Sequence, residues 1–287
     1  MARTLEPYQL VERSIITKYR KVLWNPFIEA VKRYEMIQPG DRIAVCISGG
    51  KDSMLLAKLM QQLQKHSDFP FELVFLVMDP GYNELNRRKI ESNAALLNIP
   101  VTIFESDIFE VADSAGKSPC YLCARMRRGY LYSRAQELGC SKIALGHHFN
   151  DVVETTLISM FYGSQLQAML PKLHSTNFEG MTLIRPLYCV HEDDIIAWAR
   201  DNSLEFIQCA CRLTERSAAD TGDVNVSKRK EIKLLLRRLR QGNPNIEKSI
   251  FNSIHAVALD TMPGFKTGGV EHSFLERFNA MESTEAE

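Results

Sequence analysis

An apolar segment that ends in adjacent glycines, a lysine and two serines constrains the fold of this chain more than any other feature. Residues 43–47 read Ile-Ala-Val-Cys-Ile, and the next six residues are Ser48, Gly49, Gly50, Lys51, Asp52 and Ser53. Glycines let a backbone approach an anion closely, the first N–H groups of a helix lack partners within the helix, and a lysine adds positive charge. We therefore predict a strand, a phosphate-binding turn and a helix, with an ordinary glycine-rich turn as the competing interpretation.

Short apolar segments alternate with segments of helical spacing along most of the chain. The pattern predicts strands over residues 43–47, 71–78, 101–104, 142–145 and 182–184, and helices over 53–65, 83–97, about 123–138 and 191–202. Such alternation is typical of an α/β fold, in which a parallel sheet carries helices on both faces. Ligands bind these sheets at the carboxyl ends of the strands, where the loop at 48–53 and the loop after residue 145 would both lie.

Three regions are predicted from this pattern. Residues 1–37 have helical spacing and form an N-terminal helical extension, and residues 38–212 form the α/β domain. Residues 213–287 form a small C-terminal helical part that begins with a polar loop, contains a basic amphipathic helix over 228–240 and has a disordered end. The basic helix could contact phosphates, although a basic helix face is more often only solvated.

The composition limits the classes of partner. Lys and Arg together number 35, as do Asp and Glu, so any nucleic-acid contact must come from a local patch rather than from the net charge. The sequence shows no secretory signal and no apolar run of the ~20 residues that a membrane helix needs, which predicts a cytoplasmic protein with no membrane contact. Seven cysteines in a reducing compartment favour metal or redox chemistry over structural disulfides.

A second polar cluster follows the predicted strand that ends near residue 145. Gly146, His147, His148 and Asp151 stand between that strand and the next predicted helix. The Asp151 carboxylate could hold Mg²⁺ or orient a substrate. The competing interpretation is that the two histidines only flank the start of the helix.

A third cluster combines thiols with arginines. Cys120 and Cys123 form a Cys-x-x-Cys motif just before a predicted helix, and Arg125, Arg127 and Arg128 follow it. The spacing admits zinc, a redox disulfide or an iron–sulfur cluster. Cys209 and Cys211, about 86 residues downstream, could complete a four-cysteine zinc site or supply the third ligand of a cluster. The remaining thiols, Cys46, Cys140 and Cys189, are predicted as core or near-surface residues.

Several of these motifs together resemble one enzyme family. The loop over residues 48–53 resembles the pyrophosphate loop of the PP-loop ATPases, which split ATP into AMP and pyrophosphate. Over residues 10 to about 260 the chain is similar to the tRNA 2-thiocytidine synthetase branch of these enzymes. Further matching segments are Gly40-Asp-Arg-Ile, Cys120-x-x-Cys123 with Arg127-Arg128-Gly129, Lys142 to His148, Met160-Phe-Tyr-Gly163, Pro171-Lys-Leu, Ile184-Arg-Pro-Leu187 and the Cys209/Cys211 pair.

The resemblance implies a fold, a reaction and a set of site residues. It implies a PP-loop domain like that of the adenine nucleotide alpha hydrolases, ATP and Mg²⁺, adenylation of the C2 carbonyl oxygen of a tRNA cytidine, and a [4Fe-4S] cluster that provides the sulfur. Its partners would be tRNA and a sulfur donor, either a cysteine desulfurase or sulfide, and the enzyme could be a homodimer. The residues implied for ATP are Ser48, Gly49, Gly50, Lys51, Asp52, Ser53, Gly146 and His147; for Mg²⁺, Asp52 and Asp151; for the cluster, Cys120, Cys123 and Cys211, with Cys209 as the alternative third ligand; for catalysis, Asp52, Asp151, Cys120 and Cys123; and for RNA, Arg125, Arg127 and Arg128.

The chain departs from the family pattern at two places. Asn150 precedes Asp151 where an aspartate pair is common, and Cys209 and Cys211 stand as Cys-x-Cys where Cys-x-x-Cys is expected. No cysteine precedes Cys46, so the N-terminal zinc finger of the related 2-thiouridine synthetases is missing. Two other functions stay open: a PP-loop enzyme that thiolates or amidates another nucleoside or a small molecule, and a non-catalytic nucleotide-binding module stabilised by zinc.

Overall fold

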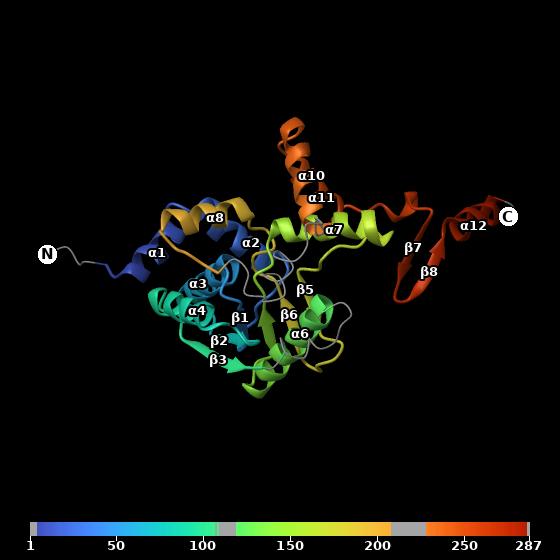
Figure 1. The fold of residues 1–287 in the computed structure, drawn as a ribbon. Coiled ribbons are helices and arrows are strands. Elements are labelled where there is room, and N and C mark those ends of the chain that lie inside the picture. Colours follow the sequence, from blue (N-terminus) through green and yellow to red (C-terminus); the bar gives the residue numbers. More distant parts are fainter. Residues whose placement is uncertain (1–4, 107, 109–118, 208–227, 286–287) are drawn as a thin grey trace. The chain divides into compact units, whose positions relative to one another are not determined.

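A six-stranded sheet lies at the centre of the computed structural model, which describes residues 5–106, 108, 119–207 and 228–285 (Figure 1). The strand order is β3-β2-β1-β4-β6-β5. All neighbouring pairs are parallel except β5 and β6, which are antiparallel. The strands are β1 (Arg42–Ile47), β2 (Glu72–Asp79), β3 (Val101–Glu105), β4 (Lys142–Ala144), β5 (Lys172–His174) and β6 (Thr182–Ile184).

Helices cover this sheet, and the strand order reverses between β1 and β4. The chain moves outward from β1 to β3 through α3 (Lys51–His66) and α4 (Glu84–Leu96) and then returns through α6 (Pro119–Glu137) to β4. Because parallel crossovers are right-handed, this reversal puts α6 on the face opposite to α3 and α4. Buried residues of β1 and β4, among them Cys46 and Ile143, pack against Tyr132 and Ala135 of α6. The predicted α/β fold is thus confirmed, and the reversal is where ligands bind in such folds.

The residues before β1 form a helical extension. It consists of α1 (Pro7–Ile16), the π-helical segment η1 (Arg20–Trp24) and α2 (Asn25–Arg33). Apolar side chains at helical spacing are buried in it, namely Val11, Ile15, Tyr19, Leu23, Phe27 and Val31. Glu12 of α1 accepts a hydrogen bond of 2.7 Å from the fully buried Lys58 of α3, which ties the extension to the α/β domain.

The contacts between described residues divide the chain into two units, Met1–Lys233 and Leu234–Glu287. The helix α10 (Lys228–Gly242) begins in the first unit and ends in the second. The second unit also contains α11 (Ile246–Ser253), η2 (Leu259–Thr261), the hairpin of β7 (Gly264–Thr267) and β8 (Val270–Ser273), and α12 (Phe274–Glu285). The domain boundaries at residues 37 and 212 stay predictions.

Three local features differ from the sequence-based expectation. The Cys-x-x-Cys motif does not precede a helix, because α6 begins at Pro119 and proline fits the first turn of a helix. Cys120 and Cys123 therefore lie in the first two turns of α6. The hairpin of β7 and β8 was not predicted, and neither was the separate helix α12 (Phe274–Glu285). The disordered end stays a prediction. Within the described residues, no helix combines the length and the apolar character required to cross a bilayer.

Candidate active site

The loop after β1 folds back on its own helix. The Ser53 hydroxyl accepts a hydrogen bond of 3.2 Å from the backbone N–H of Ser48 and donates one of 3.0 Å to the carbonyl oxygen of Gly50. Gly50 is the N-cap of α3, so the N–H groups of the first helical turn point toward this loop. Two serines thus fix the geometry of a turn that presents helix N–H groups to an anion.

Two glycines of the predicted site stand where a side chain would be crowded. Gly49 has a φ of +85°, and a Cβ there would lie 2.5 Å from the Ile90 side chain. A Cβ on Gly146 would lie 3.1 Å from the backbone nitrogen of Ser53. The loop after β4 therefore packs directly against the start of α3, which brings the first and second sequence motifs together.

Lys51 lies between two carboxylates. Its Nζ is 3.2 Å from a carboxylate oxygen of Asp52 and 3.0 Å from Oε1 of Glu192, the first residue of α8 (Glu192–Asp201). Burial alone would lower the pKa of Lys51, but these two carboxylates outweigh it and raise the pKa above its ordinary value. Burial likewise acts to raise the pKa of Glu192, yet its contacts with Lys51 and Lys233 lower that pKa to about 2. Glu192 and Lys51 form a charged pair at the phosphate loop.

The second motif caps the helix α7 (Phe149–Gly163). Nδ1 of His148 accepts a hydrogen bond of 3.3 Å from the Asp151 N–H, and Oδ2 of Asp151 accepts one of 3.0 Å from the His148 N–H. His148 thus has the helix-capping role of the competing interpretation. The same ring also faces the charged pair, because its Nε2 lies 3.9 Å from Oε1 of Glu192 and 4.0 Å from Oδ1 of Asp52.

Asn150, which departs from the family pattern, has a defined contact. Its side-chain oxygen accepts a hydrogen bond of 2.9 Å from the backbone N–H of Glu192. This bond satisfies a backbone N–H group that has no partner within α8, and it fixes the position of the Glu192 backbone. An amide at position 150 therefore holds α8 against α7.

Two cations from the start of α10 complete the cluster of charges. Nη1 of Arg229 is 2.8 Å from Oδ1 of Asp151, and Nζ of Lys233 is 3.0 Å from Oε2 of Glu192. Both also approach Glu154, at 3.7 and 3.6 Å. Glu154 is 2% exposed, and burial raises the pKa of its carboxyl group to about 7.

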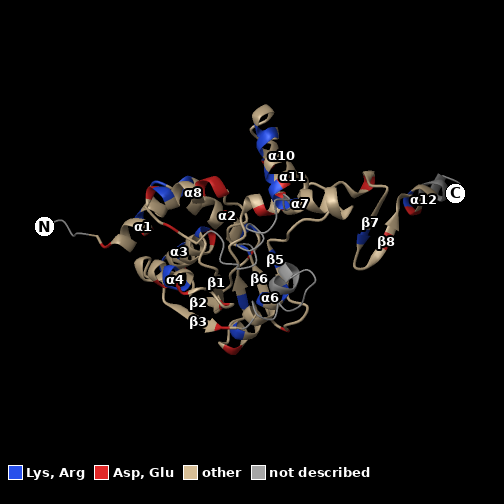
Figure 2. Cartoon of the chain, in the orientation of Figure 1, with Lys and Arg blue, Asp and Glu red and all other residues tan. Residues whose placement is uncertain are grey.

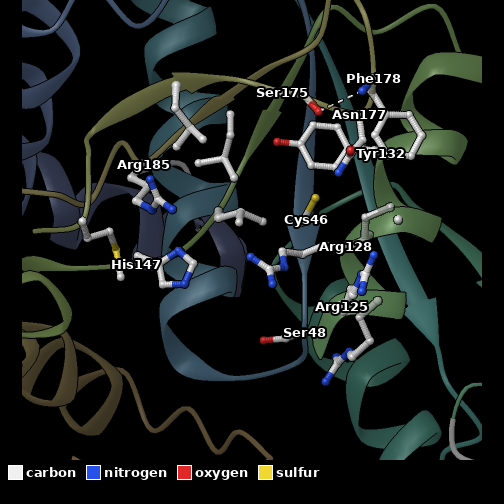
Figure 3. A pocket seen from close by; sticks show the side chains of 18 of the residues that line it. Cys46, Ser48, Arg125, Arg128, Tyr132, His147, Ser175, Asn177, Phe178 and Arg185 are labelled. Carbon is white, nitrogen blue, oxygen red and sulfur yellow. Dashed lines mark hydrogen bonds between the residues drawn. The ribbon is translucent and has the colours of Figure 1, made fainter. Parts of the chain in front are cut away.

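A cavity of about 1130 Å³ opens beside the phosphate loop. Figure 3 shows Arg185 and His147 on one wall and Arg125 and Arg128 of α6 on the facing wall, with Ser48 below them. Asp52, Ser53, Gly146 and Arg127 also line this cavity. The stacked rings of Tyr132 and Phe178, with centroids 5.0 Å apart, line it further along.

The structure thus brings together many of the predicted site residues. Ser48, Asp52 and Ser53 of the phosphate loop share the cavity with Gly146, His147 and the three arginines. Gly50 and Lys51 line a second, neighbouring pocket with Asp52, and Asp151 lies next to His148 at the start of α7. Cys209 and Cys211 lie outside the described residues, and the structure describes the backbone but not the side chains of Cys120 and Cys123. Among the described residues, Cys46, Cys140 and Cys189 are free thiols, and burial raises the pKa of each.

Sequence reasoning missed three charged residues of this region. Glu192 and Glu154 were given no functional role. Arg185 was part of a matching segment, Ile184-Arg-Pro-Leu187, which was the one signal that could have drawn attention to it.

Comparisons with known proteins place the chain in a family. Residues 17–214 match the family described as "PP-loop domain". The chain is 35% identical over 241 residues to the tRNA-cytidine(32) 2-sulfurtransferase of Geobacter metallireducens, covering 83% of this chain and 90% of that protein. It is 42% identical over 198 residues to the enzyme of that name from Neisseria meningitidis, covering 67% and 61%.

A solved structure has the same fold. The U34-tRNA thiolase NcsA from Methanococcus maripaludis, determined with its [4Fe-4S] cluster, superposes with a TM-score of 0.62 at 19% identity, covering 84% of this chain and 80% of that one. The fold, the loop and the family match define a PP-loop enzyme. Within that class, the chain belongs to the tRNA-cytidine(32) 2-sulfurtransferase family.

Proposed function

We propose that this enzyme uses ATP to replace the C2 carbonyl oxygen of a tRNA cytidine with sulfur. The names of the relatives support tRNA as the substrate and thiolation as the outcome. One observation in the chain itself carries the proposal. Three residues of the phosphate loop, Ser48, Asp52 and Ser53, line the same cavity as the arginines that follow Cys123, so an activated base and the thiol-bearing helix would meet there.

The chemistry explains why a nucleotide site is needed. A carbonyl oxygen on a pyrimidine is a poor leaving group. In the proposed reaction, this oxygen attacks the α-phosphorus of ATP and pyrophosphate departs. Sulfide then adds to C2, and the oxygen leaves as part of AMP. Lys51 and the N–H groups at the start of α3 would stabilise the charge on the departing pyrophosphate, an effect worth about 3 kcal/mol for one well-aimed donor.

Mg²⁺ fits this site as an ion shared with the phosphates. Among the described residues, no group of three or more His, Cys, Asp or Glu side chains could hold a metal ion. Magnesium, however, is commonly bound by one or two carboxylates together with phosphate oxygens. Oδ1 of Asp52 is buried at the loop and accepts no hydrogen bond, although Nζ of Lys51 lies 3.2 Å away, so this oxygen is open to such an ion. Asp151 is the second candidate, and it would give up its ion pair with Arg229 in order to bind the metal ion.

A thiol-bound centre is the proposed source of the sulfur. Cys120 and Cys123 lie on α6, and residues of this helix between Arg125 and Tyr132 line the cavity. This placement agrees with a thiol-bound group next to the cavity. A [4Fe-4S] cluster bound by Cys120, Cys123 and Cys211, or Cys209 in place of Cys211, would supply sulfide when present. The sulfur donor and a homodimeric state stay predictions.

Separate variants of the loop and of the thiols test the proposal. Cys120→Ala should abolish sulfur transfer to tRNA but bind ATP almost as the wild type does. Lys51→Ala should impair tRNA-dependent pyrophosphate release while the iron and sulfide content stays unchanged. Thiolation assays, pyrophosphate release and metal analysis after anaerobic purification measure these effects. Full thiolation by Cys120→Ala would contradict the proposed role of the thiols.

The same measurements separate the alternatives. ATP turnover that tRNA does not stimulate would indicate a small-molecule substrate. A colourless protein with stoichiometric zinc and no ATP turnover would indicate a non-catalytic module.

A further inference from the structure

Arg185 extends from the carboxyl edge of the sheet into the large cavity. It follows the last residue of β6, and its backbone N–H donates a hydrogen bond of 2.9 Å to the carbonyl oxygen of Pro171. Its Nη1 donates to the carbonyl oxygen of Leu170. Backbone and side chain are therefore both anchored to the segment before β5, and the side chain has a fixed direction (Figure 3).

The described carboxylates balance the positive charge of Arg185 only in part, because Asp151 acts on it from beyond ion-pair distance. Among the described residues, no Asp or Glu oxygen forms an ion pair with its guanidinium, and its buried Nε has no hydrogen-bond partner. Burial lowers the pKa of Arg185 to about 10, which still leaves it charged at neutral pH. Lys51, Arg229 and Lys233 differ, because each has a carboxylate within 3.2 Å.

A second buried nitrogen lies on the same wall. Nδ1 of His147 has no hydrogen-bond partner among the residues the structure describes. Burial first, and then the charge of Arg185, lower the pKa of His147 to about 4, so the imidazole is neutral at physiological pH. His147 therefore adds a polar nitrogen beside Arg185 without adding a second charge.

A partly buried cation without an ion-pair partner is costly unless a ligand brings the opposite charge. The cavity also contains Ser48 and Ser53 of the loop that would take the pyrophosphate of ATP. The next anionic group of a nucleotide bound there is its α-phosphate. A guanidinium suits this group, since its planar donors match the oxygens of a phosphate.

We infer that Arg185, with His147 beside it, binds the α-phosphoryl group that is transferred from ATP to the substrate oxygen. This inference rests on the proposed function. Arg185 is then a catalytic residue, because negative charge increases on the α-phosphoryl oxygens when the substrate oxygen attacks and before pyrophosphate has left. Lys51 holds the leaving group, and Arg185 holds the group that stays.

Two small anions test the α-phosphate part and the pyrophosphate part of this site separately. AMP carries the α-phosphate alone, and inorganic pyrophosphate represents the leaving group. Calorimetric titration of Arg185→Met should show AMP binding weakened about ten-fold or more and pyrophosphate binding within about two-fold of wild type. Lys51→Met should show the reverse. Arg88→Met, which removes an exposed arginine paired with Glu84 on α4, serves as the control and should bind both ligands normally.

Other outcomes overturn the inference. Equal weakening of AMP and pyrophosphate by Arg185→Met would make Arg185 a general support of the loop. Normal AMP binding with weaker tRNA binding would make it a contact for RNA phosphates. Should the methionine variant fail to fold, Arg185→Lys decides, because lysine can still reach Leu170 but lacks the planar fork. It should weaken AMP binding about five-fold, and wild-type affinity would refute the inference.

The test is independent of the proposed reaction. Binding of AMP and pyrophosphate needs neither tRNA nor a source of sulfur. If tRNA fails to stimulate pyrophosphate release by the wild type, the proposed function is wrong while the assignment of Arg185 can still hold. If the wild type responds to tRNA and Arg185→Met binds AMP normally, only the assignment of Arg185 is wrong.

Discussion

At the scale of single residues, the contact with Glu192 orients the ammonium group of Lys51. A lysine ammonium has three donors. Asp52 and Glu192 each take one, at 3.2 and 3.0 Å, which leaves the third for a phosphate oxygen. Lys233 holds the other oxygen of Glu192 at 3.0 Å, so the carboxylate is fixed from both sides.

Glu192→Gln keeps the shape of the side chain and removes its charge. We expect kcat for tRNA-dependent pyrophosphate release to fall about ten-fold while the KM for ATP stays within about three-fold, because the lost contact orients Lys51 rather than binding ATP itself. Asp193→Asn is the matched control, since Asp193 is exposed in the same helical turn. A Glu192→Gln enzyme that behaves like the control would show that Glu192 does not position Lys51.

At the scale of elements, sequence patterns predicted those parts whose signals are local. The strand β1 is a continuous apolar run that is buried on both faces, and the loop after it combines glycine, lysine and serine within six residues. The strand β5 has no such signal, because Lys172, Leu173 and His174 form only three residues at the edge of the sheet. Its pairing with β6 comes from tertiary contacts.

The ion pairs of the site could not be predicted from the sequence for the same reason. Lys51 and Glu192 are 141 positions apart in the chain, and their contact depends on the capping of α8 by Asn150. Arg185 is a single arginine after a short strand, and only its unpartnered Nε and the lack of an ion pair, seen in three dimensions among the described residues, indicate a ligand. Motif spacing carries no information on such contacts.

The packing of α7 beside the start of α10 should make stability depend on pH through Glu154. Burial raises the pKa of this carboxyl group to about 7 in the folded chain, from an ordinary value of 4.5. The folded chain therefore binds this proton more tightly than the unfolded chain does. The resulting stabilisation is complete below pH 4.5 and is lost as the pH rises through 7.

Glu154→Gln, which resembles the protonated carboxyl group, should remove this pH dependence. We expect the variant to melt about 5 °C above the wild type at pH 8 and close to it at pH 5. Thermal unfolding followed by circular dichroism at both pH values measures the difference. Glu91→Gln, on the exposed surface of α4, is the control and should change Tm equally at both pH values. A Glu154→Gln variant that is less stable than the wild type at pH 8 would show that the ion pairs with Arg229 and Lys233 outweigh the cost of burial.

At the scale of the whole molecule, equal numbers of acidic and basic residues mean that no net charge attracts a polyanion. Binding of tRNA must therefore depend on local concentrations of Lys and Arg. Figure 2 shows such residues along α10, where Lys228, Lys230, Arg237 and Arg238 are exposed. Arg125, Arg127 and Arg128 line the cavity instead, and their contact with the reacting nucleotide is part of the proposed function.

Neutralising the exposed part of α10 should therefore weaken tRNA binding without affecting the nucleotide site. We expect Arg237→Gln combined with Arg238→Gln to raise the Kd for tRNA about five-fold at 0.1 M salt and to reduce the slope of log Kd against log salt by about 1 to 2, because each phosphate contact releases counterions. Filter binding across a salt series measures both quantities, and the affinity for ATP should not change. Arg88→Gln combined with Lys89→Gln removes the same charge from two exposed positions on α4 and serves as the control. If both pairs change the salt slope equally, tRNA responds to the total charge rather than to α10. If neither pair changes it, the cations of the cavity carry the electrostatic part of RNA binding.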